Sequence, residues 1–193
     1  MKPLWRLAQA LPFFALVVAG LAAADAPAIQ RYPAVGSIEI AFTPDDRIDR
    51  LIVAAIYTAR HEVLVQAYSF TDHSIARALV RARKRGAEVR VVADREQARS
   101  LPQNVLPELV AGGVEVWLDG NFQAAHNKVI IIDADAPHAT TITGSYNFTI
   151  AAQRGNAESD RPARQCARRA RLPRQNWIRR KANAAPWSDD ALR

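Results

Sequence analysis

The chain has 193 residues, of which 49% are hydrophobic and 23% charged, and its formal net charge is +7. This length and composition predict one globular domain, and the single cysteine, Cys166, excludes an internal disulfide and a zinc site built on thiolates. The positive charge gathers at the two ends and in residues 159–175, which hold six arginines and one aspartate, so residues 25–158 are slightly negative and net charge alone does not identify a polyanion partner.

The N-terminal residues have the pattern of a secretory signal peptide. Lys2 and Arg6 precede an apolar run that ends in the small residues 22–24. We therefore expect a signal peptide over residues 1–24, a linker over 25–36, and a periplasmic or secreted protein. An uncleaved membrane anchor is the alternative, because the length of the run is borderline for a span.

Strand and helix patterns alternate along the rest of the chain. Apolar periodicity predicts strands at 37–42, 62–68, 88–93, 114–118, 128–133 and 140–143, and helices at 48–59, 72–85 and within 103–111. The strand at 128–133 is apolar on both faces and is expected at the centre of the sheet. The predicted fold class is α/β, with a mixed β-sheet flanked by helices on both faces and a catalytic domain over 37–158.

One short segment combines residue types that suit phosphate chemistry. His126 and Lys128 are two apart at the start of a strand, so their side chains point to the same side. An imidazole can attack an electrophile or transfer protons, and an ammonium can hold an anion. Ser145 and Asn147 follow Gly144 at the end of another strand and supply neutral hydrogen-bonding groups. Together these groups predict a phosphate site that needs no metal.

The pattern HxKxxxxD, at 126–133, followed by GSxN, at 144–147, resembles the signature of the phospholipase D superfamily. The segments YSFT at 68–71 and GSYNFTIAA at 144–152 are especially similar to the Nuc-like branch of single-motif bacterial endonucleases. The resemblance covers residues 37–158 and resumes at about 176–187, where a C-terminal helix is expected with Trp177 facing inward.

The resemblance implies a phosphodiesterase that works without metal or cofactor through a phosphohistidine. Two motifs are needed and this chain has one, so a homodimer is implied. His126 would be the nucleophile in one subunit and the general acid in the other. Lys128, Ser145 and Asn147 would contact the phosphate.

Two acidic residues complete the set of catalytic candidates carried over from the family. Glu158 matches an acidic residue that orients the histidine in relatives. Asp133 is expected to be a supporting residue tied to the region of Ser145 rather than a proton donor. The other histidines, His61, His73 and His138, are expected at helix or turn positions without partners. Core packing is favoured for Tyr68 and Phe70, and lining of the site is the alternative.

Residues 159–175 depart from the family pattern. Relatives continue with an apolar strand at this point, whereas this segment is rich in Arg, Ala and Pro and has no period. We hypothesise a pair of compensating frame changes that bound the segment; a genuine basic arm for polyanions is the alternative. Loss of a core strand would expose a sheet edge and cost stability.

The sequence leaves three functions open. The favoured one is a nonspecific endonuclease that hydrolyses phosphodiester bonds in nucleic acid. The second is a phospholipase D that acts on phospholipids with the same chemistry. The third is a catalytically impaired remnant that only binds anions.

Overall fold

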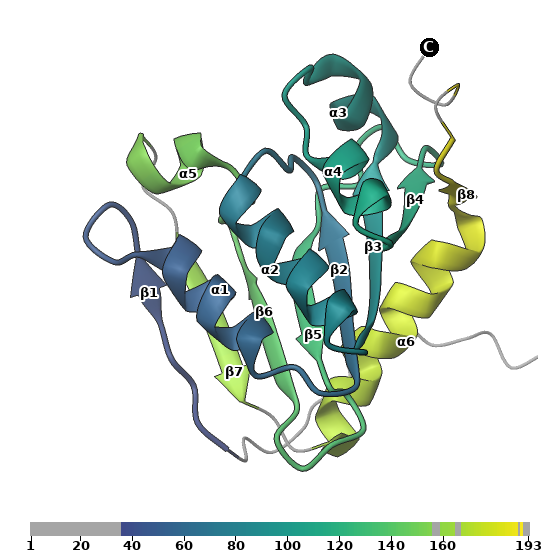
Figure 1. Cartoon of the computed structure of the whole chain (residues 1–193). Helices are drawn as coiled ribbons and strands as arrows, with labels where there is room; N and C mark the ends of the chain where they lie inside the picture. The colour runs from purple at the N-terminus through teal and green to yellow at the C-terminus, as the bar shows by residue number, and fades with distance from the viewer. Residues whose placement is uncertain (1–35, 156–158, 165–166, 189, 191–193) are drawn as a thin grey trace, which may run out of the picture. The chain divides into compact units, whose positions relative to one another are not determined.

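The computed structural model describes residues 36–155, 159–164, 167–188 and 190. Within them one eight-stranded mixed sheet has the order β1-β7-β6-β5-β2-β3-β4-β8 (Figure 1). The strands are β1 (Ala41–Phe42), β2 (Glu62–Ala67), β3 (Glu88–Asp94), β4 (Glu115–Asp119), β5 (Lys128–Ile132), β6 (Thr140–Gly144), β7 (Ser159–Arg164) and β8 (Ala185–Pro186). The apolar strand β5 lies between β6 and β2, in the interior of the sheet as predicted.

Helices cover both faces of this sheet, which confirms the predicted architecture (Figure 1). The helices are α1 (Ile48–Tyr57), α2 (His73–Lys84), α3 (Arg95–Ser100), α4 (Leu106–Ala111), α5 (Ile150–Arg154) and α6 (Ala167–Asn183). Side chains alternate along β2, so Val63 and Val65 join the core beneath α1, α2 and α4, while Leu64 joins a smaller core with Trp177 of α6. No helix in these described parts of the chain has the length and apolarity needed to cross a membrane.

Local sequence signals explain where α2 begins and ends. The carboxylate of Asp72 accepts hydrogen bonds from the backbone N–H groups of Ser74 and Ile75, and so caps the first turn. At the other end Gly86 has a φ of 98°, a conformation that glycine adopts without steric cost. The helix therefore presents Ile75 and Leu79 to the core, both fully buried.

Helix α6 packs across the second face through Trp177, whose side chain is 1% exposed. Its indole Nε1 donates to Val65 O at 2.9 Å, so the ring is both buried and hydrogen-bonded. At the N-terminal end of β2, Arg174 Nε contacts Glu62 Oε1 at 3.0 Å. The predicted inward-facing tryptophan is confirmed, and the helix begins earlier than residue 176.

The main difference from the sequence prediction is β7, which lies inside the arginine-rich segment. The backbone of residues 159–164 pairs antiparallel with β6 and β1, so a strand occupies the place between them. The segment lacks apolar alternation and contains Pro162, which has no N–H to donate. These signals argue against a strand. The strand is defined by its pairing with β6, which is distant in the sequence, and not by a local pattern.

Smaller differences concern short elements. The predicted strand at 37–42 is reduced to Ala41–Phe42, and its neighbours Ile38 and Ile40 are exposed. The short helices α3 and α5 and the two-residue strand β8 were not predicted.

Candidate active site

Four of the predicted site residues, His126, Lys128, Ser145 and Asn147, lie at one edge of the sheet, here called the site edge, because several strands end there. Strands β2, β3 and β4 are mutually parallel, and β5 runs antiparallel to β2. The register pairs Ala67, the last residue of β2, with Lys128, the first residue of β5. Val129 pairs with Thr143, so β6 also ends here and delivers the GSYN segment to the same edge.

His126 and Lys128 are in contact at this edge. Lys128 Nζ lies 3.1 Å from Nδ1 and 3.2 Å from Nε2 of the His126 imidazole, and 3.3 Å from the His126 carbonyl oxygen. The lysine is 5% exposed, whereas the histidine is exposed to solvent. A buried ammonium is therefore held against an accessible imidazole, which confirms that the two side chains project together.

Tyr68 completes this arrangement, so the alternative that it lines the site holds in place of the favoured core packing. Its ring centroid lies 4.3 Å from that of His126, with the two planes tilted by 57°. Lys128 Nζ lies 4.9 Å from the Tyr68 centroid, within the range of a cation–π contact. The signal that could have found Tyr68 is its position directly after β2, at the edge where the motif strands also end.

Asn147 and Ser145 follow β6 at the site edge. The Asn147 side chain is half-buried, and its Oδ1 has no hydrogen-bond partner among the residues that the structure describes. An unpaired buried acceptor is costly, and such groups often serve a ligand. Ser145 is exposed.

The segment that carries Asn147 is held by its neighbour Phe148. The Phe148 carbonyl accepts hydrogen bonds from the backbone N–H groups of Thr71 at 2.9 Å and Asp72 at 3.0 Å. The Phe148 ring packs against the edge of Phe70, with centroids 5.5 Å apart. Phe70 is thus a core residue, as predicted, and fixes the GSYN segment against the start of α2.

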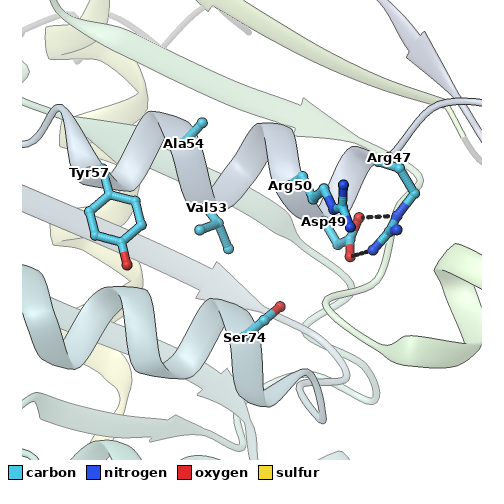
Figure 2. Close-up of a pocket in the computed structure, with 7 residues that line it drawn as sticks. All are labelled: Arg47, Asp49, Arg50, Val53, Ala54, Tyr57 and Ser74. Carbon is cyan, nitrogen blue, oxygen red and sulfur yellow. Dashed lines mark hydrogen bonds and ion pairs between the residues drawn. The ribbon is translucent and has the colours of Figure 1, made fainter.

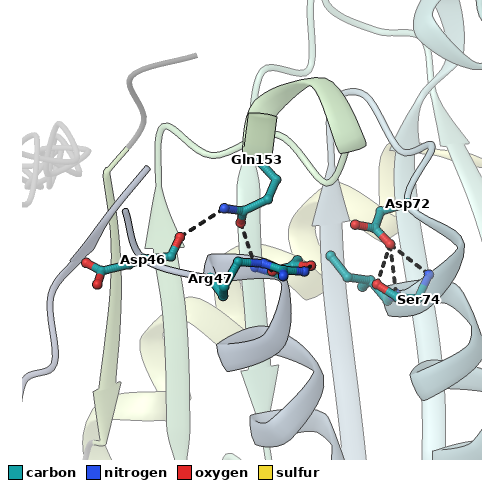
Figure 3. A network of polar contacts seen from close by, with 7 residues as sticks. Asp46, Arg47, Asp72, Ser74 and Gln153 are labelled. Carbon is teal, nitrogen blue, oxygen red and sulfur yellow. Dashed lines mark hydrogen bonds and ion pairs between the residues drawn. The ribbon is translucent and has the colours of Figure 1, made fainter. Parts of the chain in front are cut away.

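Gln153 of α5, the helix that follows this segment in the chain, makes a second connection (Figure 3). Its Nε2 donates to Asp46 O at 2.9 Å, and its Oε1 accepts from the Asp49 N–H at 3.2 Å. The side chain is 8% exposed, so these bonds are shielded from water. They tie α5 to the start of α1.

Asp94 holds the residues that precede the histidine, and the sequence analysis did not identify it. Its Oδ2 accepts from the Ala125 N–H at 2.6 Å, and its Oδ1 accepts from the Gln97 N–H at 2.8 Å. The side chain is 1% exposed at the end of β3. One buried carboxylate therefore caps α3 and anchors the backbone one residue before His126.

Asp133 lies at the opposite edge of the sheet, which corrects the expectation that it is tied to Ser145. It is five residues beyond Lys128 along β5, about 16 Å at the usual rise of a strand. Its carboxylate accepts from the backbone N–H groups of Arg60 at 2.9 Å, His61 at 2.7 Å and Glu62 at 2.9 Å. Asp133 thus caps the turn into β2 and does not reach the catalytic candidates.

Two further expectations involve single residues. Glu158 lies outside the residues that the structure describes, so its role remains a prediction. His73 was expected to have no partner, but its Nδ1 lies 2.6 Å from Glu108 Oε2, which links α2 to α4. Among the described residues no group of three or more His, Cys, Asp or Glu side chains is placed to hold a metal ion.

A groove of about 400 Å³ lies between α1 and α2 (Figure 2). Its lining includes the ion pair between Arg47 and Asp49, with Nη2 and Oδ2 at 2.6 Å. Partial burial raises the pKa of Asp49, but hydrogen bonds from Arg47 and the Arg50 N–H, with both positive charges, outweigh burial and bring that pKa below its ordinary value. The same ion pair raises the pKa of Arg47. The groove contains none of the residues with predicted chemistry.

Comparisons with known proteins agree with this geometry. A family model described as the PLD-like domain of cardiolipin synthase matches residues 52–161. A phospholipase D of Rickettsia bellii is 38% identical over 145 residues, which cover 75% of this chain and 69% of that protein. A mitochondrial cardiolipin hydrolase of Xenopus laevis is 29% identical over 115 residues, covering 60% of this chain and 52% of that protein.

The same relationship holds in three dimensions. The crystal structure of Nuc from Salmonella typhimurium, a phospholipase D family member, superposes with a TM-score of 0.72 at 30% identity. The match covers 79% of this chain and 99% of Nuc. With the paired histidine and lysine at the start of β5 and the GSYN segment at the same edge, these matches show that the chain belongs to the phospholipase D superfamily of phosphodiesterases.

Proposed function

We propose that this phosphodiesterase is an endonuclease that cleaves nucleic acid through a covalent phosphohistidine on His126. The observation that carries the proposal is the contact between Lys128 Nζ and the imidazole, at 3.1 and 3.2 Å from its two nitrogens. An ammonium at this position can hold a phosphate oxygen while a ring nitrogen attacks phosphorus. The positive charge that phosphoryl transfer requires then comes from Lys128, and no metal ion is needed.

The reaction has two displacement steps. In the first, the His126 nitrogen forms a bond to phosphorus, and the bond from phosphorus to the leaving oxygen breaks as a second imidazole donates a proton to that oxygen. In the second, the second imidazole takes a proton from water, whose oxygen displaces His126 from phosphorus. Asn147 follows β6 at the same edge and would bind phosphate through its amide nitrogen, which is a hydrogen-bond donor.

The second imidazole is proposed to be His126 of another copy of the chain. Each chain contributes one HxK pair, so two copies related by a twofold axis would bring two together. Sedimentation velocity tests this directly. We expect a dimer at the concentrations of the activity assay, and an active monomer would contradict the proposal.

Nucleic acid is favoured as the substrate by the match to nearly the whole length of Nuc at 30% identity. Phospholipid is the second candidate, because relatives at 38% and 29% identity are a phospholipase D and a cardiolipin hydrolase. Both substrates present a phosphodiester, so the HxK pair suits either one.

A parallel assay separates these candidates. The full chain is incubated in chelator with supercoiled plasmid or with vesicles of phosphatidylcholine and cardiolipin, beside His126→Ala and the control His138→Ala. His138 is exposed and follows β5 at the opposite edge of the sheet. We expect nicked plasmid from the wild type and the control, and none from His126→Ala.

Each other outcome assigns a different function. Release of a lipid headgroup without nicking would make the chain a phospholipase. Binding of plasmid without turnover would make it an anion-binding remnant, and a requirement for added magnesium would contradict the metal-independent mechanism.

Export from the cytoplasm is proposed from residues 1–24, which lie outside the described residues. Cell fractionation and the mass of the mature N-terminus test it. A chain that retains Met1 in the membrane fraction would indicate an anchor instead.

A further inference from the structure

Arg180 of α6 contacts three parts of the structure around the segment that carries the catalytic histidine. Its Nη1 lies 3.5 Å from Asp119 Oδ2 at the end of β4. Its Nη2 donates to Oδ1 of Asn127, the residue between His126 and Lys128. Its guanidinium also lies over the Phe122 ring, 4.2 Å from the centroid. One side chain thus joins the C-terminal helix to the HxK motif.

The irregular residues 120–127, here called the His126 loop, have few other supports. Asp94 binds the Ala125 N–H, and Arg95 Nη2 donates to Gly120 O at 3.1 Å. Asn121 donates through its Nδ2 to Asn183 O at the end of α6. The loop therefore lies between the strand ends and α6, and the side chains of Asp94 and Arg180 hold the residues directly before and after His126.

The imidazole of His126 is itself exposed, so core packing does not fix its orientation. Its position depends on the backbone of the loop, on the Tyr68 ring and on Lys128. A hydrogen bond to the side chain of Asn127 restrains the backbone directly next to both catalytic candidates.

We propose that Arg180 is a positioning residue that clamps Asn127, and through it the His126 imidazole and the Lys128 ammonium, in the arrangement required for attack on phosphorus. The proposal rests on the proposed function of His126. Arginine suits the role because its planar fork presents separate N–H groups to Asp119 and Asn127 while its face covers Phe122. A lysine has a single terminal nitrogen and cannot make these contacts together. Arg180 acts through its neighbours and is not assigned a contact with substrate.

The test uses the full chain and three variants: Asn127→Ala, Arg180→Ala, and the double variant that combines these two changes. Arg179→Ala is the control. Arg179→Ala removes the same charge from the same helix at an exposed position. Because a small displacement of a reacting group can cost about a hundredfold in rate, we expect kcat of plasmid nicking to fall about tenfold to a hundredfold in Asn127→Ala and Arg180→Ala. We expect KM to change by less than about twofold, since substrate contacts remain.

The double variant measures whether the two residues act as a unit. We expect its kcat to equal the lower of the two kcat values of the single variants, because either change breaks the same contact. A multiplicative loss in the double variant would overturn the clamp. So would a rise in KM of equal size in Arg180→Ala and Arg179→Ala, because charge alone would then explain the effect.

Arg180→Ala leaves the buried Asp119 carboxylate without its ion pair and can fail to fold. Asn127→Ala keeps that pair, and Arg180→Lys keeps a positive charge, so these two variants decide the question in that case. We expect both to fold and both to lose kcat. Wild-type kcat in either folded variant would overturn the proposal.

Amide hydrogen exchange gives a readout that does not depend on activity. We expect residues 121–127 to exchange about tenfold faster in Asn127→Ala than in the wild type, with unchanged exchange in β2 and β3. Unchanged exchange in the loop would overturn the clamp even if the enzyme is active. Absence of any His126-dependent turnover, with faster exchange in the loop, would instead overturn the proposed function and leave the clamp established.

Discussion

Replacement of Asp133 separates a structural from a catalytic role for the last residue of the HxKxxxxD motif. Its carboxylate accepts three backbone hydrogen bonds, from residues 60, 61 and 62, and its backbone φ is 48°. Asp133→Ala removes all three acceptors and places alanine in the left-handed region. Asp133→Asn keeps one oxygen acceptor, and asparagine tolerates this conformation.

The magnitude follows from these contacts. A hydrogen bond to a charged group contributes about 1.5–3 kcal/mol, and two of the three bonds are only partly buried, so the lower end applies to them. With the backbone strain of alanine, we expect Asp133→Ala to lower the free energy of unfolding by about 6 kcal/mol, and Asp133→Asn by about 1–2 kcal/mol. For a chain of this size the corresponding falls in Tm are about 12–24 °C and about 2–8 °C.

Thermal unfolding followed by circular dichroism measures this change, with Asp45→Ala as an exposed acidic control. Turnover of plasmid is then measured well below each Tm and expressed per folded molecule. We expect kcat to stay within about threefold of the wild type, because Asp133 is about 16 Å from Lys128 along the strand. A loss of kcat about a hundredfold or greater in Asp133→Asn, with unchanged Tm, would refute the structural assignment.

Three further predictions follow from other contacts. Lys128→Met keeps the packing of a long side chain but removes the cation, so we expect plasmid nicking to be lost while the circular dichroism spectrum is unchanged; retained nicking would contradict the role of the ammonium. Trp177→Ala removes a fully buried ring and its hydrogen bond to Val65. We expect urea denaturation to show that the free energy of unfolding falls by about 3–5 kcal/mol. An unshifted midpoint would show that α6 does not stabilise the sheet. The pKa of Asp49 is lowered in the folded state, so its contribution to stability is present above the ordinary carboxyl pKa of about 3.9 and is lost as pH falls through the folded pKa. Asp49→Asn should therefore be less stable than the wild type at neutral pH and equally stable in acid. A stability difference that does not change with pH would contradict the ion pair as its cause.

Much of the fold could be predicted because the elements concerned have strong local patterns. The predicted bounds of the apolar strands β2, β3 and β5 and of the amphipathic helix α1 differ from the observed bounds by one or two residues. Their periodicity reflects burial on one or both faces, and burial here agrees with local propensity. The short helices α3 and α5 have five or six residues, too few for a periodic signal, and their caps depend on Asp94 and Thr149.

Strand β7 could not be predicted for a different reason. Its residues lack apolar alternation, and antiparallel pairing defines it as a strand, with β6 on one side, from Thr140 opposite Arg164 to Gly144 opposite Asp160, and β1 on the other. Strand pairing joins residues distant in the chain, so no window of sequence contains that information. The expected loss of a core strand after Glu158 is therefore wrong for the backbone of residues 159–164.

The sequence by itself identified the two groups proposed to carry the chemistry, because the spacing of His126 and Lys128 at the start of one strand places an imidazole and an ammonium on the same side. The tertiary structure alone decided which residues support them. Asp94, Tyr68 and Arg180 reach the motif from β3, β2 and α6, and Asp133, although part of the motif, lies at the far end of the strand. Supporting contacts arise from strand order and helix packing, and these depend on the arrangement of the whole chain.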